Sequence, residues 1–216
     1  MTLSLSGLAR LAHHAGWAGL LAACATAVAC SSTNNPPPDA FIAPEVGGGG
    51  SPCSTLPSPD TMFLPVGTST GQKPTTVADQ GSTGNGTASI TCTVHPQGNG
   101  FDIELSVAVA GNPGGNITIT SPQGAGAVTT SGGSGISASF YSDNQGYSAS
   151  DCKITYTYQG QPVPDNPPIA AGRIWGHIDC PHAVAGGGQM TTGPDGGPTE
   201  VACPASADFL FEQCNQ

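Results

Sequence analysis

The chain has 216 residues and a formal net charge of −10 at pH 7, with only 4 Lys and Arg residues against 14 Asp and Glu. So few dispersed cations cannot form the basic stripe that a phosphate backbone requires, and we expect neither a nucleic-acid partner nor electrostatic attraction to anionic lipid. Gly (32) and Pro (20) are abundant, but apolar runs survive between them. The composition therefore indicates a turn-rich β domain with flexible flanks.

The first predicted element is a leader over residues 1–29. One cation, Arg10, precedes a mainly apolar run, AGWAGLLAACATAVA, over residues 15–29. A membrane-spanning helix needs about 20 apolar residues, so this run is short for a span. Its length and the small residues at its end are typical of a secretory signal peptide. The alternative, a helix of the folded domain, fits poorly with the Pro- and Gly-rich segment that follows.

Two four-residue stretches near the end of the leader each end in cysteine: LAAC over residues 21–24 and AVAC over residues 27–30. Here the chain resembles bacterial lipoprotein precursors, whose signal ends in a lipobox of an apolar residue, two small residues and a cysteine. In that family the cysteine is lipidated and cleavage occurs just before it. The resemblance covers only the leader and tether. It implies a covalent membrane anchor and no particular activity.

Cys30 is the predicted lipidation site, with Cys24 as the alternative because LAAC has the preferred Leu in first place. Lipidation at Cys30 leaves six cysteines, an even set for an oxidising compartment, whereas lipidation at Cys24 leaves seven. Ala27 and Ala29 also form an A-x-A site for ordinary signal peptidase, so a secreted, unlipidated protein is a further alternative. Ser31 after the cysteine gives no acidic retention signal, which by the same resemblance favours the outer membrane or cell surface.

Residues 30–52 are predicted to be a disordered tether that begins with the lipidated cysteine. The Pro triplet at 36–38 favours extended polyproline geometry, and the four glycines at 47–50 favour free coil. The folded domain is predicted over residues 53–216, with a first short strand at 61–66.

From residue 87 onward apolar and polar residues alternate. TASITCTVHP and GFDIELSVAVAG each place their apolar residues on one face, and PQGNG between them is a turn signal, so the two segments predict a β-hairpin. Asp102 and Glu104 are expected to face solvent. Five further strands are predicted, at 116–120, 135–142, 151–158, 171–180 and 207–214. This pattern is typical of an all-β, antiparallel β-sandwich or jelly roll.

The cysteines predict a disulfide-bonded domain, because neither a C-x-x-C pair nor a Cys/His cluster of zinc spacing is present. Antiparallel pairing of residues 152–158 with 174–180 sets Cys152 opposite Cys180, which favours that bridge. A competing register sets Cys180 against Cys203. With the first bridge, the remaining pairs would be Cys203–Cys214 and Cys53–Cys92.

The stretch GRIWGHIDCPH holds the candidate site residues. On a strand, four of its side chains point one way: Arg173, Trp175, His177 and Asp179. They could form a ligand platform in which the Trp ring supplies a flat apolar face and the polar groups fix orientation. Alternatively the Trp packs under a loop. A third reading is a metal site in which His182 joins His177 and Asp179.

The sequence contains no H-E-x-x-H or phosphate-loop motif. We therefore expect a lipid-anchored envelope protein with a non-enzymatic binding or structural domain and no cofactor. Its expected partners are the membrane, through the lipid, and an envelope protein or glycan. One alternative is a carbohydrate-binding module using Trp175 and nearby aromatics, and another is a metal-dependent hydrolase using His177, Asp179 and His182.

Overall fold

The structure is a computed structural model. It describes residues 37–46, 68–70, 73–75, 77–78, 82–83, 86–111, 114–142, 145–186, 190–192, 195–200 and 202–216. Within these ranges the chain is all-β, and every ladder between its strands is antiparallel. The predicted all-β, antiparallel, disulfide-bonded fold is confirmed. The leader, both candidate lipidation sites and the strand expected at 61–66 lie outside the described residues.

Most of the strands belong to one sheet with the order β4-β1-β18-β15-β11-β10-β8-β7-β6-β5, to which β9 and β14 add at the side. Its members are β1 (Asp39–Val46), β4 (Val77–Ala78), β5 (Ser82–Thr83), β6 (Gly86–Gln97), β7 (Gly100–Gly111), β8 (Gly115–Thr120), β9 (Val128–Thr129), β10 (Gly132–Ser142), β11 (Gln145–Thr155), β14 (Ile169–Ala170), β15 (Arg173–Gly186) and β18 (Ala202–Glu212). Three further pairs are β2 (Thr68–Thr70) with β3 (Lys73–Thr75), β12 (Thr157–Tyr158) with β13 (Gln161–Pro162), and β16 (Met190–Thr192) with β17 (Pro198–Glu200).

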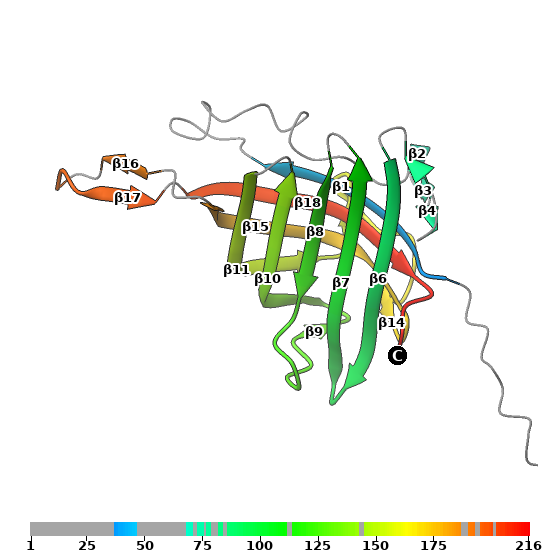
Figure 1. The fold of residues 1–216 in the computed structure, drawn as a ribbon. Helices are drawn as coiled ribbons and strands as arrows, with labels where there is room; N and C mark the ends of the chain where they lie inside the picture. Colours follow the sequence, from blue (N-terminus) through cyan, green and yellow to red (C-terminus); the bar gives the residue numbers. More distant parts are fainter. Residues whose placement is uncertain are drawn as a thin grey trace, which may run out of the picture. The chain divides into compact units, whose positions relative to one another are not determined.

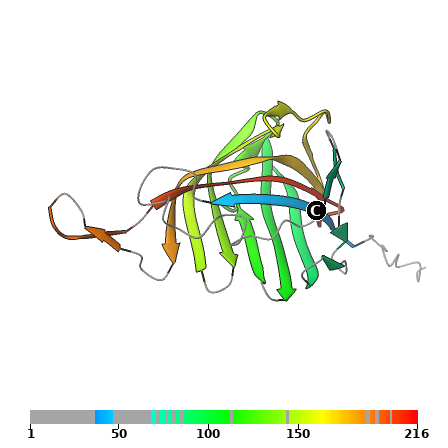
Figure 2. The same cartoon turned by 90° about the horizontal axis from the view of Figure 1, so that it is seen from above.

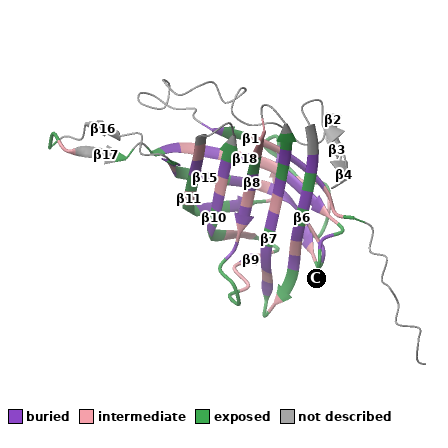
Figure 3. Cartoon of the chain, viewed as in Figure 1, coloured by how far each residue is buried: buried purple, intermediate pink, exposed green. Residues whose placement is uncertain are grey.

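The sheet folds over into two layers. β6, β7, β8, β10 and β11 form one layer, and β15, β18 and β1 cross behind it (Figures 1 and 2). The inner faces enclose one apolar core, to which Leu105 and Phe140 contribute from the first layer and Ile42 and Phe209 from the second, each 0% exposed. Figure 3 shows buried and exposed residues alternating along β6 and β7, as period-two patterning requires. The arrangement is sandwich-like.

The C-terminal tail ties β18 back to β6. Cys214 is disulfide-bonded to Cys92 on β6. The backbone N–H of Val94 donates to the carbonyl of Asn215, and the N–H of Asn215 donates to the carbonyl of Cys92, both at 2.9 Å. Gly172 joins this junction with φ +77, donating to the carbonyl of Val94 and accepting from the N–H of Cys214. The tail therefore links the two layers at one corner.

The predicted tether boundary is wrong for residues 39–46, which form β1. This strand pairs with β18 over its whole length, and Ala40 and Ile42 are 0% exposed. The short apolar run FIA stands between a Pro triplet and a Gly run, which conceal it in the composition. Its partner, β18, lies more than 150 residues away in the chain, so nothing local indicates that β1 completes a sheet.

The Cys152–Cys180 bridge is confirmed, in the register that predicted it: the neighbouring pairs Lys153 with Asp179 and Ile154 with Ile178 place the two cysteines opposite one another. The bridge Cys92–Cys214 shows that the other two predicted pairs were wrong. Cys203–Cys214 and Cys53–Cys92 each join cysteines that are consecutive along the chain, whereas the C-terminal tail lies against β6 in the fold, so that Cys214 meets Cys92. Cys203 is also disulfide-bonded, and Cys53 lies outside the described residues.

The β6–β7 hairpin forms as predicted, with a two-residue turn in which Gly98 has φ +58. Asp102, however, is not in solvent. It is 9% exposed, and its carboxylate accepts the backbone N–H groups of Gly124 at 2.5 Å and Gly126 at 2.9 Å. Glu104 is exposed as expected.

Candidate functional site

The residues of the predicted platform lie on the outer face of β15, as the alternation indicated, while Ile174, Ile178 and Cys180 face the core. Trp175 nevertheless is 0% exposed. It belongs to a second small apolar cluster with Phe41, Tyr158 and Leu210, which the segment around β12 and β13 covers. The ring centroids of Tyr158 and Trp175 lie 5.9 Å apart. The structure thus shows Trp175 packed under a loop, with no ring face available for a ligand.

Arg173 is engaged with the same covering segment. Its guanidinium donates to the Asp165 carboxylate at 2.6 Å, and both side chains are about one-third exposed. This ion pair fastens the segment after β13 to the outer face of β15. Arg173 and Trp175 therefore hold the cover in place and do not form an open platform.

His177 pairs with Asp208, its direct neighbour across the β15–β18 ladder. The Nδ1 of His177 lies 2.9 Å from Oδ1 of Asp208, and the backbone N–H of Gln159 donates to the other carboxylate oxygen at 3.3 Å. The hydrogen bond to Asp208 raises the pKa of His177, burial opposes the shift, and the charges of Asp208, Asp179 and Glu45 add to it. The register of the β15–β18 ladder sets this pair, and the Gln159 contact places it beside the β12–β13 hairpin.

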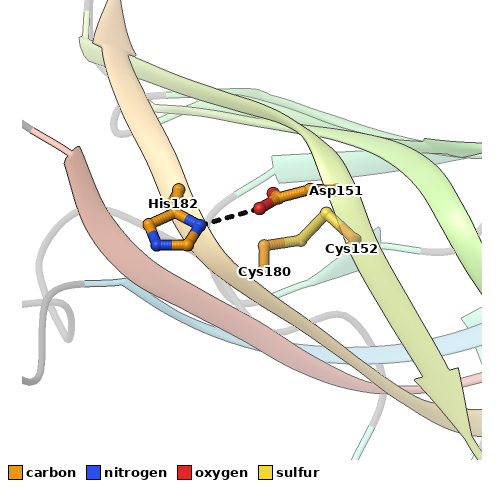
Figure 4. Close-up of a disulfide and its surroundings, with 4 residues drawn as sticks. All are labelled: Asp151, Cys152, Cys180 and His182. Atoms are coloured by element: carbon orange, nitrogen blue, oxygen red, sulfur yellow. Dashed lines mark hydrogen bonds and ion pairs between the residues drawn. A yellow bond between two sulfur atoms is a disulfide. The ribbon is translucent and has the colours of Figure 1, made fainter.

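His182 forms a separate pair with Asp151. Its Nδ1 lies 2.7 Å from Oδ2 of Asp151, and both side chains are exposed, 72% and 48% respectively. Figure 4 shows this pair bridging β15 and β11 beside the Cys152–Cys180 disulfide. His177 and His182 thus have different acidic partners. Within the described residues no three His, Cys, Asp or Glu side chains are placed to hold a metal ion, so the suggested metal set of His177, Asp179 and His182 is not brought together.

Two β-bulges create the His182–Asp151 pair. On β10 one residue separates Ile136 from Ala138, but on β11 two residues separate their partners. In the same way, two residues separate Cys180 from Ala183 on β15, but one residue separates their partners on β18. At each place two consecutive residues are exposed, which breaks the alternation. Because bulges re-aim side chains, Asp151 and His182 meet on the outer face although they are not opposite one another in the ladder.

The pair lies at an open groove of about 810 Å³ on the outer face of β8, β10, β11 and β15. This volume is within the range of about 300–1,000 Å³ that is common for small-molecule sites. Small, mainly hydroxyl-bearing side chains line it. The lining residues are Thr118, Thr120, Ser137, Ala138, Ser139, Ser148, Ala149, Ser150, Asp151, His182 and Val184.

A second hollow of about 390 Å³ adjoins the first, and Ser139 and Ser148 line both. Tyr141 and Gly146 also line this second hollow. We call the two hollows together the hydroxyl groove. Tyr141 is 43% exposed and is the one exposed large hydrophobic side chain among the residues that the structure describes.

The sequence alone did not predict the hydroxyl groove. The available signal was the alternation of Ser and Thr with apolar residues in NITIT, GISASF and YSAS. That alternation predicts hydroxyls on the outer face of each strand, but it does not say which strands are neighbours. The groove depends on the order β8-β10-β11-β15 and on the bulges, and neither is a local property of the sequence.

No protein-family model, no curated protein and no solved structure matches this chain. The part of the chain that the structure describes contains no helix long and apolar enough to cross a membrane.

Proposed function

We propose that this chain is a lipid-anchored envelope protein whose β domain binds a ligand, without catalysis, in the hydroxyl groove. The groove itself carries the proposal: it is an open hollow with exposed serine hydroxyls and the exposed Tyr141, on a domain whose other described aromatic side chains are buried or partly buried. The disulfides indicate an oxidising compartment. The lipobox resemblance supports anchorage through Cys30 at the outer membrane or cell surface.

Binding is favoured over nucleophilic catalysis by the contacts of His182. A serine nucleophile is activated by a hydrogen bond to a neighbouring base. Among the described residues, the hydrogen bond of His182 is to Asp151, and no groove serine is bonded to the imidazole. The buried ring of Trp175 argues against a glycan platform at that residue, and the separation of His177 from His182 argues against the metal-dependent hydrolase.

Anchorage is tested by the intact mass and the cell fraction of the mature protein. We expect a mass that begins at Cys30 with its lipid, recovery in the membrane fraction, and no free thiol among the other cysteines. Cys30→Ser should abolish lipidation, whereas Cys24→Ser should leave it unchanged. A lipid on Cys24, or a soluble mature protein, would contradict the anchor assignment.

Ligand binding is tested by retention on isolated cell-envelope material of the purified protein that carries Cys30→Ser, so that no lipid contributes to retention. Ser148→Trp should fill the centre of the hydroxyl groove and reduce retention at least fivefold. Ser89→Trp is the matched control, because Ser89 is exposed on β6 outside the groove. Equal retention of the two variants would show that the groove is not the binding surface. Circular dichroism should confirm that both variants fold.

A further inference from the structure

We propose that the ligand of the hydroxyl groove is a neutral glycan chain, which stacks one sugar ring on Tyr141 and is oriented by Asp151 and His182. This proposal rests on the proposed function and names its ligand class. It places the sugar platform on β10, away from Trp175.

Tyr141 has the support that a stacking platform needs. In the ladders it stands opposite Gly146, and Gly146 stands opposite Gly186. A Cβ at Gly146 would come within 3.2 Å of Cδ2 of Tyr141. The glycine therefore lets the ring lie close against the neighbouring strand while 43% of the residue stays exposed. An aromatic ring that is held in this way offers an apolar face at small entropic cost, which suits the C–H face of a sugar.

The strand order supplies a row of hydroxyls next to Tyr141. Thr118, Ser139 and Ser148 are direct neighbours across β8, β10 and β11. Adjacent strands lie about 4.8 Å apart, so the row presents a hydroxyl at each such step. Ser148 and Ser150 are exposed and make no side-chain hydrogen bond with another described residue. A serine hydroxyl both donates and accepts, as a sugar hydroxyl does, so each can bond to the ligand in either sense.

Asp151 and His182 supply the oriented polar groups at the other end. Their mutual contact uses Oδ2 of Asp151 and Nδ1 of His182. Oδ1 of Asp151 and Nε2 of His182 therefore remain for a ligand, the first as an acceptor from sugar hydroxyls. The disulfide beside them links β11 to β15 and holds the two bulges in place (Figure 4). Polar groups that are held in fixed positions orient a bound glycan.

The charge of the groove selects a neutral chain. Asp151 is the one acidic residue among the lining residues of the larger hollow, and His182 accompanies it. A chain with net charge −10 repels a polyanion. A polycation would require several acidic groups in the lining, and the described lining has only one. Hydroxyl-rich and nearly neutral, the groove matches an uncharged polyhydroxylated ligand.

The test is binding of the purified mature protein to an array of neutral glycans, followed by calorimetry with cellohexaose, chitohexaose and maltohexaose. Dextran sulfate and hexalysine serve as charged probes. We expect at least one neutral glycan to bind and both charged probes to fail. Tyr141→Ala should weaken that binding by about tenfold, whereas Tyr141→Phe should retain it within about twofold, because stacking needs only the ring.

Ser148→Ala and Ser150→Ala should each weaken glycan binding by about two- to tenfold, in line with the loss of one hydrogen bond. Ser89→Ala, outside the groove, should have no effect. Binding that is insensitive to Tyr141→Ala, or an array without any bound neutral glycan, would overturn the glycan assignment. If no glycan binds but Ser148→Trp reduces envelope retention, the groove binds a ligand of another class. If no glycan binds and Ser148→Trp leaves envelope retention unchanged, the proposed function is wrong as well.

Discussion

At the scale of single residues, Asp102 lies on the polar side of its strand, yet its carboxylate accepts hydrogen bonds that stabilise a neighbouring turn. The turn over residues 123–126 folds against β7, and two of its backbone N–H groups point at the carboxylate. Gly126 has φ +55, and a Cβ there would lie 2.3 Å from the carbonyl oxygen of Gln97. The turn therefore requires both a glycine and the acidic side chain beneath it.

Replacing Asp102 by Ala should lower the free energy of unfolding by about 2–3 kcal/mol, because two backbone donors lose a charged acceptor. Glu104→Ala is the matched control, since Glu104 is exposed on the same strand, and it should change stability by less than about 0.5 kcal/mol. Urea denaturation measures both. Equal effects would show that the hydrogen bonds of Asp102 contribute nothing to stability.

The His177–Asp208 pair makes stability depend on pH. The pKa of His177 is raised in the folded protein, first by its hydrogen bond to Asp208. The pair therefore contributes its full stabilisation below the unfolded pKa of about 6.5 and loses it as the pH rises through the higher folded value. Asp208→Asn should destabilise the protein more at pH 5 than at pH 9. Denaturation at the two pH values, with an NMR titration of His177, measures this.

Asp179→Asn is the control for this prediction, because Asp179 acts on His177 through charge alone and its effect is a smaller one. We expect a smaller fall in the pKa of His177 for Asp179→Asn than for Asp208→Asn. The opposite order would contradict the assignment of Asp208 as the main cause of the raised pKa.

At the scale of elements, the β12–β13 hairpin works as a cover for the outer face of β15. Tyr158 on β12 contacts both Phe41 and Trp175, with ring centroids 5.9 Å apart in each case. The turn between the two strands has positive φ at Gln159 and Gly160, and the Gln159 N–H also bonds to Asp208. One short hairpin thus buries Trp175 and completes the surroundings of His177.

Trp175 reports on this cover, since Trp17 lies in the predicted leader. The mature protein should show blue-shifted emission and little quenching by acrylamide. Tyr158→Ala should shift the emission to longer wavelength and increase quenching, because it removes the ring that contacts Trp175. Tyr141→Ala should change neither. A wild-type spectrum typical of exposed Trp would contradict the buried position.

At the scale of the whole molecule, the disulfides join segments that are distant in sequence. The Cys92–Cys214 bridge spans 122 residues and the Cys152–Cys180 bridge spans 28. The chain-entropy model gives about 5 kcal/mol for the longer loop and about 3.5 kcal/mol for the shorter. Replacing Cys92 and Cys214 together by Ala should therefore lower the unfolding midpoint more than the same change at Cys152 and Cys180. Thermal denaturation of the two double variants tests this order.

The disulfide connectivity also leads to a prediction about disulfide formation during folding. Cys203 is disulfide-bonded. If the protein is cleaved before Cys30 and lipidated there, as we propose, Cys53 is the one cysteine left to pair with Cys203. Cys53–Cys203 and Cys92–Cys214 would then both join cysteines that are not consecutive along the chain. If cysteines are oxidised in the order in which they are synthesised, consecutive cysteines pair first, and these pairs are not native. A disulfide isomerase should therefore accelerate refolding. Peptide mapping under non-reducing conditions would contradict this if Cys203 has another partner.

The class of fold follows from local sequence patterns, because the alternation of apolar and polar residues is a property of each strand on its own. The turn signal PQGNG predicted the β6–β7 hairpin, and the register of adjacent strands predicted the Cys152–Cys180 bridge. The alternation also placed Arg173, Trp175, His177 and Asp179 on one face of β15. Whether that face is open depends on the β12–β13 hairpin, which no local pattern indicates.

Which strands are neighbours depends on contacts between distant parts of the chain, and the predictions that were wrong concern such contacts. β1 joins the sheet because β18 supplies its partner, and Cys92 pairs with Cys214 because the tail crosses to β6. The hydroxyl groove arises from four adjacent outer faces and from bulges that bring Asp151 to His182. Strand pairing and bulges depend on contacts between residues far apart in sequence, so periodicity within one strand cannot specify them.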